Sequence, residues 1–438
     1  MILMMYFLYD IFLFLAALAY LPFYALRGRV HGKIFTRLGF FKRDDFLAIR
    51  GKDVIWIHAV SVGEARAAES LVKLIRQEWP KKRIVISTVT STGHEIVKRI
   101  VNENELVFYA PLDISLVVGK FLRHIAPSFL IIMETEIWPN LIRLSKRRGV
   151  SVVVVNGRIS DRSYRRYNRL KSLLKPVLLS MDLFCMQTEE AGQRVVALGA
   201  RVGRVKITGN IKFDISADLK EPSFFSFLKE SLRGCLFFIA GSTHENEEEE
   251  MVDIYKSLRK DFNHLRMLIA PRHLERVDRI RRMIRFHGLE AVNLSHLSAS
   301  PTGGSTRGSG PMSLSSGQVM LLDTIGDLNA LYRLCDIAFV GGSLVKKGGH
   351  NPIEPALFGK PIIFGKHMDN FREIRDIFIG ERAALEVDSP QALEYELRRL
   401  LGDPHERKAL GDRAKALLDK NKGAAGRAFA EIRKIIQT

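Results

Sequence analysis

Hydrophobic positions along the chain fall into two alternating patterns. Runs of four or five apolar residues, bounded by glycine or polar residues, are typical of strands buried on both faces of a parallel sheet. Amphipathic stretches such as 65–78, 93–101 and 189–198 lie between these runs and predict helices. The strands expected in the first half of the chain are Val54–His58, Arg83–Ser87, Leu106–Tyr109, Phe129–Met133, Val152–Asn156, Leu183–Gln187 and Val205–Thr208.

A more polar stretch at 216–226 interrupts the alternation, which therefore predicts two α/β domains, 27–220 and 221–438. A segment at 297–317, rich in Ser, Gly and Thr, predicts a flexible surface insertion outside the core. Two Rossmann-like domains facing a cleft make up the GT-B arrangement, although the pattern alone fits any two-domain α/β protein. The strands expected in the second domain are Leu236–Ala240, Met267–Ala270, Ala291–Asn293, Val319–Leu322, Ile337–Val340 and Pro361–Phe364.

The first 26 residues are apolar and aromatic apart from Asp10, which is long enough to cross a bilayer. Basic residues follow at once, at Arg27, Arg29, Lys33 and Arg37, and this predicts that the rest of the chain lies on the cytoplasmic side. The segment has no basic start and no small-residue cleavage site. We therefore expect an uncleaved membrane anchor at 1–26, spanning the bilayer or lying deep in its interface. The alternative is a core helix of the first domain.

The chain of 438 residues carries a net charge of +19, with 67 Lys and Arg against 48 Asp and Glu. Such an excess predicts an anionic partner: nucleic acid, an acidic membrane surface or a phosphorylated substrate. No zinc-ligand spacing, helix-turn-helix signature or RNP motif is present, so we expect no nucleic-acid partner. The three cysteines lie far apart in apolar sequence, which indicates reduced residues of a cytoplasmic protein.

Acidic residues stand directly after two of the first domain's buried strands. Glu64 lies near a helix N-terminus at the carboxyl edge of the sheet, where it could serve as a general base or complete a capping box with Ser61. Glu134 follows an entirely apolar strand, where packing poorly explains an acid, so it could face the cleft or be a solvated loop residue. Lys212, close to the end of this domain, could reach a phosphate or be an ordinary surface lysine.

In the second domain, the strand at 337–340 leads into Gly341-Gly342-Ser343 and then Gly348–Pro355. A glycine-rich loop before a helix N-terminus suits a phosphate, and Glu354 could bind ribose hydroxyls. The loops after other strands of this sheet add an anion-binding candidate at 240–245, the guanidinium of Arg272, and 323–328 for a base or ribose. Each of them alone is also explained as turn chemistry.

Taken in order, these motifs resemble the 3-deoxy-D-manno-oct-2-ulosonic acid (Kdo) transferases of lipopolysaccharide synthesis. The resemblance implies an inverting GT-B transferase with CMP-Kdo as donor and a lipid A precursor as acceptor, on the cytoplasmic face of the inner membrane. It places Glu64 as general base, and Glu134 and Lys212 as groups that support the transition state. The residues in the CMP-contact places are Pro271, Arg272, Ile325, Gly326, Asp327, Asn351, Pro352, Ile353 and Glu354.

Two positions depart from the family pattern: Thr36 replaces an acid that many members have before Arg-x-Gly, and Asp327 replaces a common Glu. No Asp-x-Asp pair of metal-binding type follows a strand, so we expect neither a metal requirement nor a cofactor. Two alternatives stay open from the sequence. One is a GT-B transferase that uses a UDP- or GDP-sugar on another membrane acceptor. The other is a catalytically silent, membrane-anchored protein that binds anionic lipid.

Overall fold

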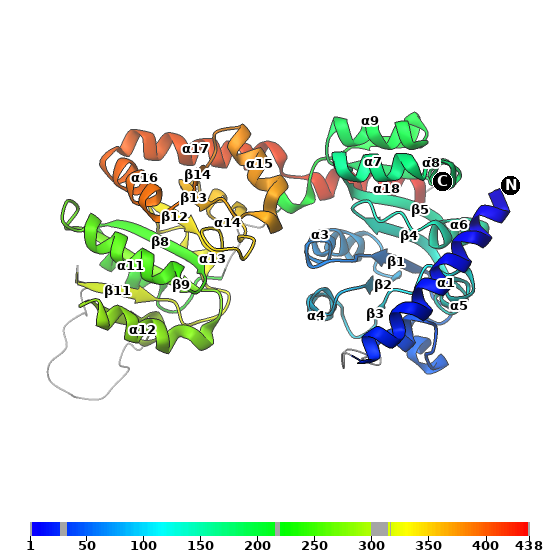
Figure 1. Cartoon of the computed structure of the whole chain (residues 1–438), viewed down its shortest axis with the longest axis horizontal. Coiled ribbons are helices and arrows are strands. Elements are labelled where there is room, and N and C mark those ends of the chain that lie inside the picture. Colours follow the sequence, from blue (N-terminus) through cyan, green and yellow to red (C-terminus); the bar gives the residue numbers. More distant parts are fainter. Residues whose placement is uncertain (1, 27–32, 215–219, 299–313, 316, 437–438) are drawn as a thin grey trace. The chain divides into compact units, whose positions relative to one another are not determined.

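The computed structural model describes residues 2–26, 33–214, 220–298, 314–315 and 317–436. The chain divides into two compact units (Figure 1). Unit 1 comprises Met1–Asp214 together with Asn421–Thr438, and unit 2 comprises Ile215–Lys420. In the described parts of the chain, each unit contains one seven-stranded sheet whose strand pairs are all parallel. The predicted α/β class with two Rossmann-like halves is confirmed.

The sheet of unit 1 has the order β3-β2-β1-β4-β5-β6-β7. The strand order reverses between β1 and β4, and ligands of such open sheets bind beside the carboxyl ends of the strands at this switch point. Every strand expected in this half is present. The bounds are β1 (Val54–His58), β2 (Arg83–Thr88), β3 (Leu106–Tyr109), β4 (Pro127–Met133), β5 (Ser151–Gly157), β6 (Leu183–Met186) and β7 (Val205–Ile207).

Helices cover both faces of this sheet because its strands are apolar on both sides. Along β1, Trp56 packs into one hydrophobic cluster while Ile55 and Ile57 pack into the other. The helices of unit 1 are α1 (Ile2–Leu26), α2 (Lys33–Arg37), α3 (Val62–Glu78), α4 (Ser91–Ile100), α5 (Ser115–Ile125), α6 (Pro139–Arg147), α7 (Asp161–Arg169), α8 (Lys171–Ser180), α9 (Glu189–Leu198) and α18 (Ala424–Ile436), with 3-10 turns at η1 (Arg43–Ile49), η2 (Val202–Arg204) and η3 (Ile211–Phe213).

The last helix of the chain, α18, belongs to unit 1 and packs on α3 and β5. Asp214 stabilises its start: the carboxylate accepts hydrogen bonds from the backbone N–H groups of Gly423 and Ala425, each at 2.6 Å. An acid at a helix N-terminus satisfies free amides and favours the helix dipole. The prediction that 221–438 forms a single domain therefore differs from the structure at residues 421–438, where a buried apolar face decides the packing.

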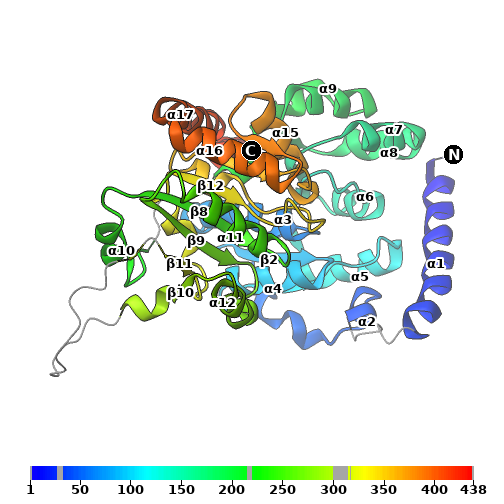
Figure 2. The ribbon, with the colours of Figure 1, turned by 60° about the vertical axis from the view of Figure 1, so that its left-hand side comes forward.

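Helix α1 lies along the edge of unit 1 beside α5, α6 and α8 (Figure 2). Polar side chains dock it there: the Tyr9 hydroxyl donates to Asp113 at 3.1 Å, and Asp10 accepts from the Ser115 backbone N–H at 2.9 Å and from Asn140 at 2.8 Å. Among the residues that the structure describes, no helix is both long and apolar enough to cross a membrane, so a spanning anchor is not confirmed.

The sheet of unit 2 has the order β10-β11-β9-β8-β12-β13-β14, with its switch point between β8 and β12. Every expected strand is present, and β14 is an addition that the sequence did not predict. The bounds are β8 (Leu236–Thr243), β9 (Leu265–Pro271), β10 (Glu290–Asn293), β11 (Gln318–Leu321), β12 (Ile337–Val340), β13 (Ile362–Gly365) and β14 (Leu385–Val387).

Most of the predicted insertion at 297–317 lies outside the described residues. Its described ends are part of the fold: Leu314 is buried in a core cluster and Leu297 packs against that cluster, so the expectation of no role in the core is wrong there. The helices of unit 2 are α10 (Phe225–Ser231), α11 (Glu247–Leu258), α12 (Val277–Phe286), α13 (Leu328–Leu331), α14 (Ile353–Ala356), α15 (Arg372–Gly380), α16 (Pro390–Gly402) and α17 (Pro404–Asn421), with 3-10 turns at η4 (Leu274–Arg276), η5 (Leu294–Ser298) and η6 (Asp369–Phe371).

Candidate active site

Glu64 lies in the first turn of α3, directly after β1 at the switch point of unit 1. Its side chain is buried, with 4% of the residue exposed. One carboxylate oxygen accepts from the Val60 backbone N–H at 2.7 Å and the other accepts from the Ser61 hydroxyl at 2.8 Å. Ser61 in turn accepts from the Glu64 N–H at 3.3 Å, which is one half of the predicted capping box; in the other half the carboxylate accepts from the Val60 N–H in place of the Ser61 N–H. The cap fixes the position of the carboxylate.

The surroundings of Glu64 also change its acidity. Burial raises the pKa of Glu64 to about 7, and the neighbouring carboxylates of Glu134 and Glu136 add to the rise, against the two hydrogen bonds from Val60 and Ser61. A buried carboxylate loses hydration, which destabilises the charged form. A carboxylate with a pKa near 7 can hold or release a proton at neutral pH, as a general base must.

Glu134 follows β4, the strand on the other side of the switch point, and is also buried, with 7% exposed. Its oxygens accept from Lys212 Nζ at 2.8 Å and from Arg158 Nε at 2.7 Å. Burial by itself would raise the pKa of Glu134, but Lys212 and Arg158 hold this pKa below its ordinary value. Near neutral pH, Glu134 therefore stays ionised, whereas Glu64 can take up and release a proton. Its backbone φ of 54° is uncommon for a side chain other than glycine, as found at constrained functional positions.

The two acidic groups share one neighbourhood. A methyl group placed on Gly63, in the first turn of α3, would lie 3.8 Å from Lys212 Nζ, so the ammonium group that pairs with Glu134 lies beside the turn that carries Glu64. Pairs of acids whose surroundings separate their pKa values are the usual way to obtain two different roles from one residue type. The structure thus brings Glu64, Glu134 and Lys212 together, as their positions after strands suggested.

Arg158 belongs to this group as well, although it was not among the predicted site residues. It lies just after β5, at the same sheet edge as Glu134, and a strand-end position was the signal that pointed to it. Buried Asn156 is a second missed residue. Its side-chain oxygen accepts from the Ile211 backbone N–H at 2.9 Å, which holds the turn that presents Lys212.

In unit 2, the predicted nucleotide residues lie in loops at the carboxyl ends of β9, β11 and β12. The Arg272 side chain is exposed, and the described part of the chain offers its guanidinium no hydrogen bond or ion pair. Asp327 accepts from the Thr324 hydroxyl at 2.5 Å, while Ile325 is 88% exposed. Asn351 accepts from the Ile353 backbone N–H at 3.1 Å and so shapes the start of α14, which carries Glu354.

The glycine-rich loop after β12 differs from the prediction in one respect. Its backbone N–H groups at Gly342, Ser343 and Leu344 point to the buried carboxylate of Glu247, at 2.7, 3.0 and 3.0 Å. The N–H of His244 donates to the same carboxylate at 2.9 Å. An internal carboxylate thus engages the amides of Gly342, Ser343 and Leu344, in the first part of the loop that we expected to bind a phosphate.

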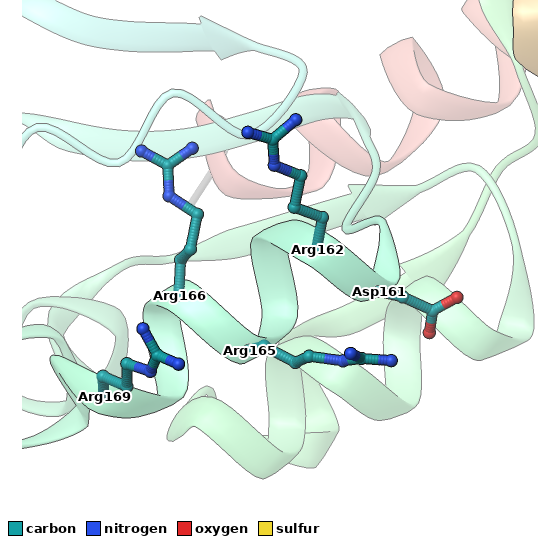
Figure 3. A pocket seen from close by; sticks show the side chains of 5 residues that line it. All are labelled: Asp161, Arg162, Arg165, Arg166 and Arg169. Atoms are coloured by element: carbon teal, nitrogen blue, oxygen red, sulfur yellow. The ribbon is translucent and has the colours of Figure 1, made fainter.

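A basic surface on α7 forms a shallow hollow of about 350 Å³ (Figure 3). Arg162 and Arg166 extend in the same direction from this helix, one turn apart. The hydroxyl of Tyr167, also on α7, donates to the backbone oxygen of Thr135 at 3.1 Å, which ties the helix to the loop of Glu134. The residues that line the hollow are Asp161, Arg162, Arg165, Arg166 and Arg169. We call these four arginines the α7 arginine cluster.

Known proteins provide an independent comparison. Residues 32–215 match the family model described as 3-Deoxy-D-manno-octulosonic-acid transferase (kdotransferase). The chain is 34% identical over 403 residues to the 3-deoxy-D-manno-octulosonic acid transferase of Haemophilus influenzae, covering 91% of this chain and 90% of that protein. It is 31% identical over 386 residues to the transferase of the same name from Bordetella pertussis, covering 85% of each.

Among solved structures, the chain is similar to a UDP-GlcNAc 2-epimerase from Neisseria meningitidis, with a TM-score of 0.54, 11% identity, and coverage of 87% of this chain and 100% of that one. It is also similar to a glycosyltransferase from Rickettsia africae, with a TM-score of 0.51, 14% identity, and coverage of 89% and 99%. These likenesses show the fold. In the described residues, no group of three or more His, Cys, Asp or Glu side chains is arranged to hold a metal ion.

Proposed function

The chain belongs to the 3-deoxy-D-manno-octulosonic acid transferase family, and we propose that it moves Kdo from CMP-Kdo to a lipid A precursor by a single, inverting displacement. The observation that carries the proposal is the contrast between Glu64 and Glu134. One buried acid has its pKa raised to about 7 while its neighbour is held ionised by two cations. Such a contrast fits a transferase that must accept one proton per turnover.

Glu64 is the general base of the proposed reaction. It takes the proton from a sugar hydroxyl of the acceptor while that oxygen attacks the anomeric carbon of Kdo. The new carbon–oxygen bond forms as the bond from the anomeric carbon to the phosphate of CMP breaks. CMP leaves with that electron pair, and one proton remains on the carboxyl group of Glu64. Attack opposite the leaving group inverts the anomeric configuration.

Glu134 and Lys212 support the transition state in this proposal. The transition state of glycosyl transfer has oxocarbenium character, so a fixed negative charge near the anomeric carbon stabilises it. The ionised Glu134 carboxylate supplies that charge. Lys212 holds this carboxylate at 2.8 Å and provides a positive charge beside the turn of Glu64. Preorganised charges of this kind need no rearrangement during the reaction.

We assign donor binding to unit 2. The exposed guanidinium of Arg272 is the main phosphate ligand, and its planar fork suits a phosphate monoanion. Glu354 accepts from the ribose hydroxyls, and the loop of Gly326 and Asp327 contacts the cytosine. Since a single phosphate carries less charge than a diphosphate, side-chain cations are sufficient in this scheme, and we propose a metal-independent reaction.

We further propose that unit 1 docks on the cytoplasmic face of the inner membrane. The outward side of α1 exposes large apolar side chains that the protein leaves uncovered, an arrangement typical of helices that lie in a membrane interface. The α7 arginine cluster can bind phosphates of anionic lipid or of the acceptor. The exposed apolar residues of α1 are Met4, Phe7, Leu8, Ile11, Phe12, Phe14, Leu15 and Leu18.

One experiment tests the reaction: the full-length protein in detergent is incubated with CMP-Kdo and a tetraacylated lipid A precursor, and the lipid product is weighed by mass spectrometry. We expect a product heavier by one or more Kdo residues, with activity unchanged by a metal chelator. Competition separates the donors, because CMP should inhibit and UDP should not. Inhibition by UDP alone, or a product lacking Kdo, would refute the proposal.

A second experiment tests docking, with vesicles of phosphatidylglycerol and phosphatidylcholine against vesicles of phosphatidylcholine alone. The double variant Arg165→Glu/Arg166→Glu should bind the anionic vesicles less and lose activity on vesicle-embedded acceptor, while CMP binding is retained. The control Arg282→Glu/Arg285→Glu makes the same charge change at two exposed positions of α12 in unit 2. Equal losses in both variants would show that only net charge matters.

A further inference from the structure

Two histidines far apart in the sequence form a close pair at the switch point of unit 2. His244 follows β8, and His350 lies in the loop between β12 and α14. Their Nε2 atoms are 2.9 Å apart and their ring centroids 5.2 Å apart, with an angle of 6° between the ring planes, so the two rings meet edge to edge. Gly342, with φ of 67°, makes room for them, since a methyl group there would lie 3.1 Å from a carbon of each ring.

The contact between the two nitrogens restricts the protonation of the pair. At 2.9 Å one Nε2 must donate its proton and the other must accept it. One further proton can be added at Nδ1 of the donor ring without breaking this bond. A second added proton would place hydrogens on both facing nitrogens, which the distance forbids. The pair can therefore take up one proton and no more.

Without a ligand, the surroundings of His244 oppose its protonation. Burial and nearby cations lower the pKa of His244 to about 4. The His273 ring lies edge-on to His244 at 5.6 Å, and the carboxylates close by are already engaged, Glu247 by four backbone amides and Glu248 by Arg276 at 2.8 Å. The charged or titratable groups that act on the His244 ring are His273, Lys347, Arg276 and Arg272.

We propose that the His244–His350 pair is part of the donor site and takes up one proton from solvent when the phosphate of CMP binds. The inference rests on the proposed donor site. An anion at Arg272 would cancel the positive field that opposes protonation, so the charged form of the pair becomes favourable in the complex. The imidazolium then donates a hydrogen bond and offsets the charge that CMP gains as it leaves the sugar.

The sign of the linkage follows from this order of protonation. The pair binds more protons in the complex than in the free protein, so the affinity for CMP rises as the pH falls. One proton corresponds to at most about a tenfold change in affinity per pH unit. The phosphate of CMP itself titrates near pH 6. The measurement is therefore made between about pH 7 and 8.5, where CMP stays mainly dianionic.

Calorimetric titration of the full-length protein with CMP, in buffers of different ionisation enthalpy at about pH 7.5, measures the protons taken up. We expect between about half a proton and one for the unsubstituted protein. His244→Gln and His350→Gln can keep a hydrogen bond but cannot titrate, so the uptake should fall to near zero. In both variants the affinity should lose most of its dependence on pH. His264→Gln, at the opposite edge of the sheet, should behave as the unsubstituted protein.

The outcomes separate the two proposals. CMP binding without proton uptake, or with the same uptake in the variants of the pair, would overturn the role of the pair alone. Absence of any CMP binding to the unsubstituted protein would refute the donor site and the inference together. Cytidine, which lacks the phosphate, should bind weakly and without proton uptake. Equal uptake with cytidine would show that the proton follows the base and would also overturn the inference.

Discussion

Replacement of Glu64 by glutamine separates its two possible roles through the sign of the change in stability. A folded-state pKa of about 7, against 4.5 for an ordinary glutamate, means that ionisation of the buried group costs the folded state about 3 kcal/mol. Between pH 4.5 and about 7, Glu64 is protonated in the folded protein but ionised in the unfolded chain. The folded state therefore loses stability over this range as the pH rises. Glutamine is never charged, so the variant avoids this loss of stability.

The same substitution weakens the helix cap. Glutamine keeps one acceptor for Val60 or Ser61 but loses the other, at a cost of about 1 kcal/mol. Near pH 8 the variant should therefore be more stable than the parent by about 2 kcal/mol, which raises Tm by several degrees for a unit of this size. Near pH 4, where Glu64 is largely protonated in both the folded and the unfolded parent, only the cap is lost and the variant should be less stable by about 1 kcal/mol.

Activity should change in the opposite direction to stability at pH 8. Loss of the base lowers kcat by at least about a hundredfold, roughly 2.7 kcal/mol of barrier. The assays are thermal melts at both pH values and product formation from CMP-Kdo. Ser61→Ala is the matched control, because it removes a cap partner but keeps the carboxylate, so it should lose stability and retain most activity. A glutamine variant that melts lower at both pH values and stays active would make Glu64 a helix cap only.

Three further predictions concern the charged groups around the proposed site. Lys212→Met removes a cation from Glu134, so the pKa of Glu134 should rise and kcat should fall by about tenfold or more, measured as a pH–rate profile; an unchanged profile would contradict the role of the pair. Arg272→Ala should weaken CMP binding by about tenfold or more with an unchanged Tm, since among the described residues its exposed side chain makes no hydrogen bond or ion pair; an unchanged Kd would mean that the phosphate binds elsewhere. Glu247→Gln places an amide donor against backbone donors, so both Tm and CMP affinity should fall; a loss of stability alone would leave the loop without a role in binding.

The fold was largely predictable because its strands are local features of the sequence. A short strand that is apolar on both faces is buried only when helices cover both sides of the sheet. Because the strands are parallel, the loops after them lie at the same edge of the sheet. That reasoning placed Glu64, Glu134 and Arg272 correctly at the carboxyl edges of the two sheets. It missed β14, since this short edge strand carries Glu386, which pairs with Arg375 and gives the strand a polar appearance.

Contacts between distant segments were decided by the tertiary structure. Nothing local showed that Glu247, within a run of acids, would occupy the amides of the glycine-rich loop, or that His244 would meet His350, 106 residues later. The last helix belongs to unit 1 for the same reason, because Asp214 accepts a hydrogen bond from the Gly423 N–H and apolar residues of α18 and α3 share one core cluster. Burial and pairing also set the pKa difference between Glu64 and Glu134, and both depend on neighbours that the chain brings together only when it folds.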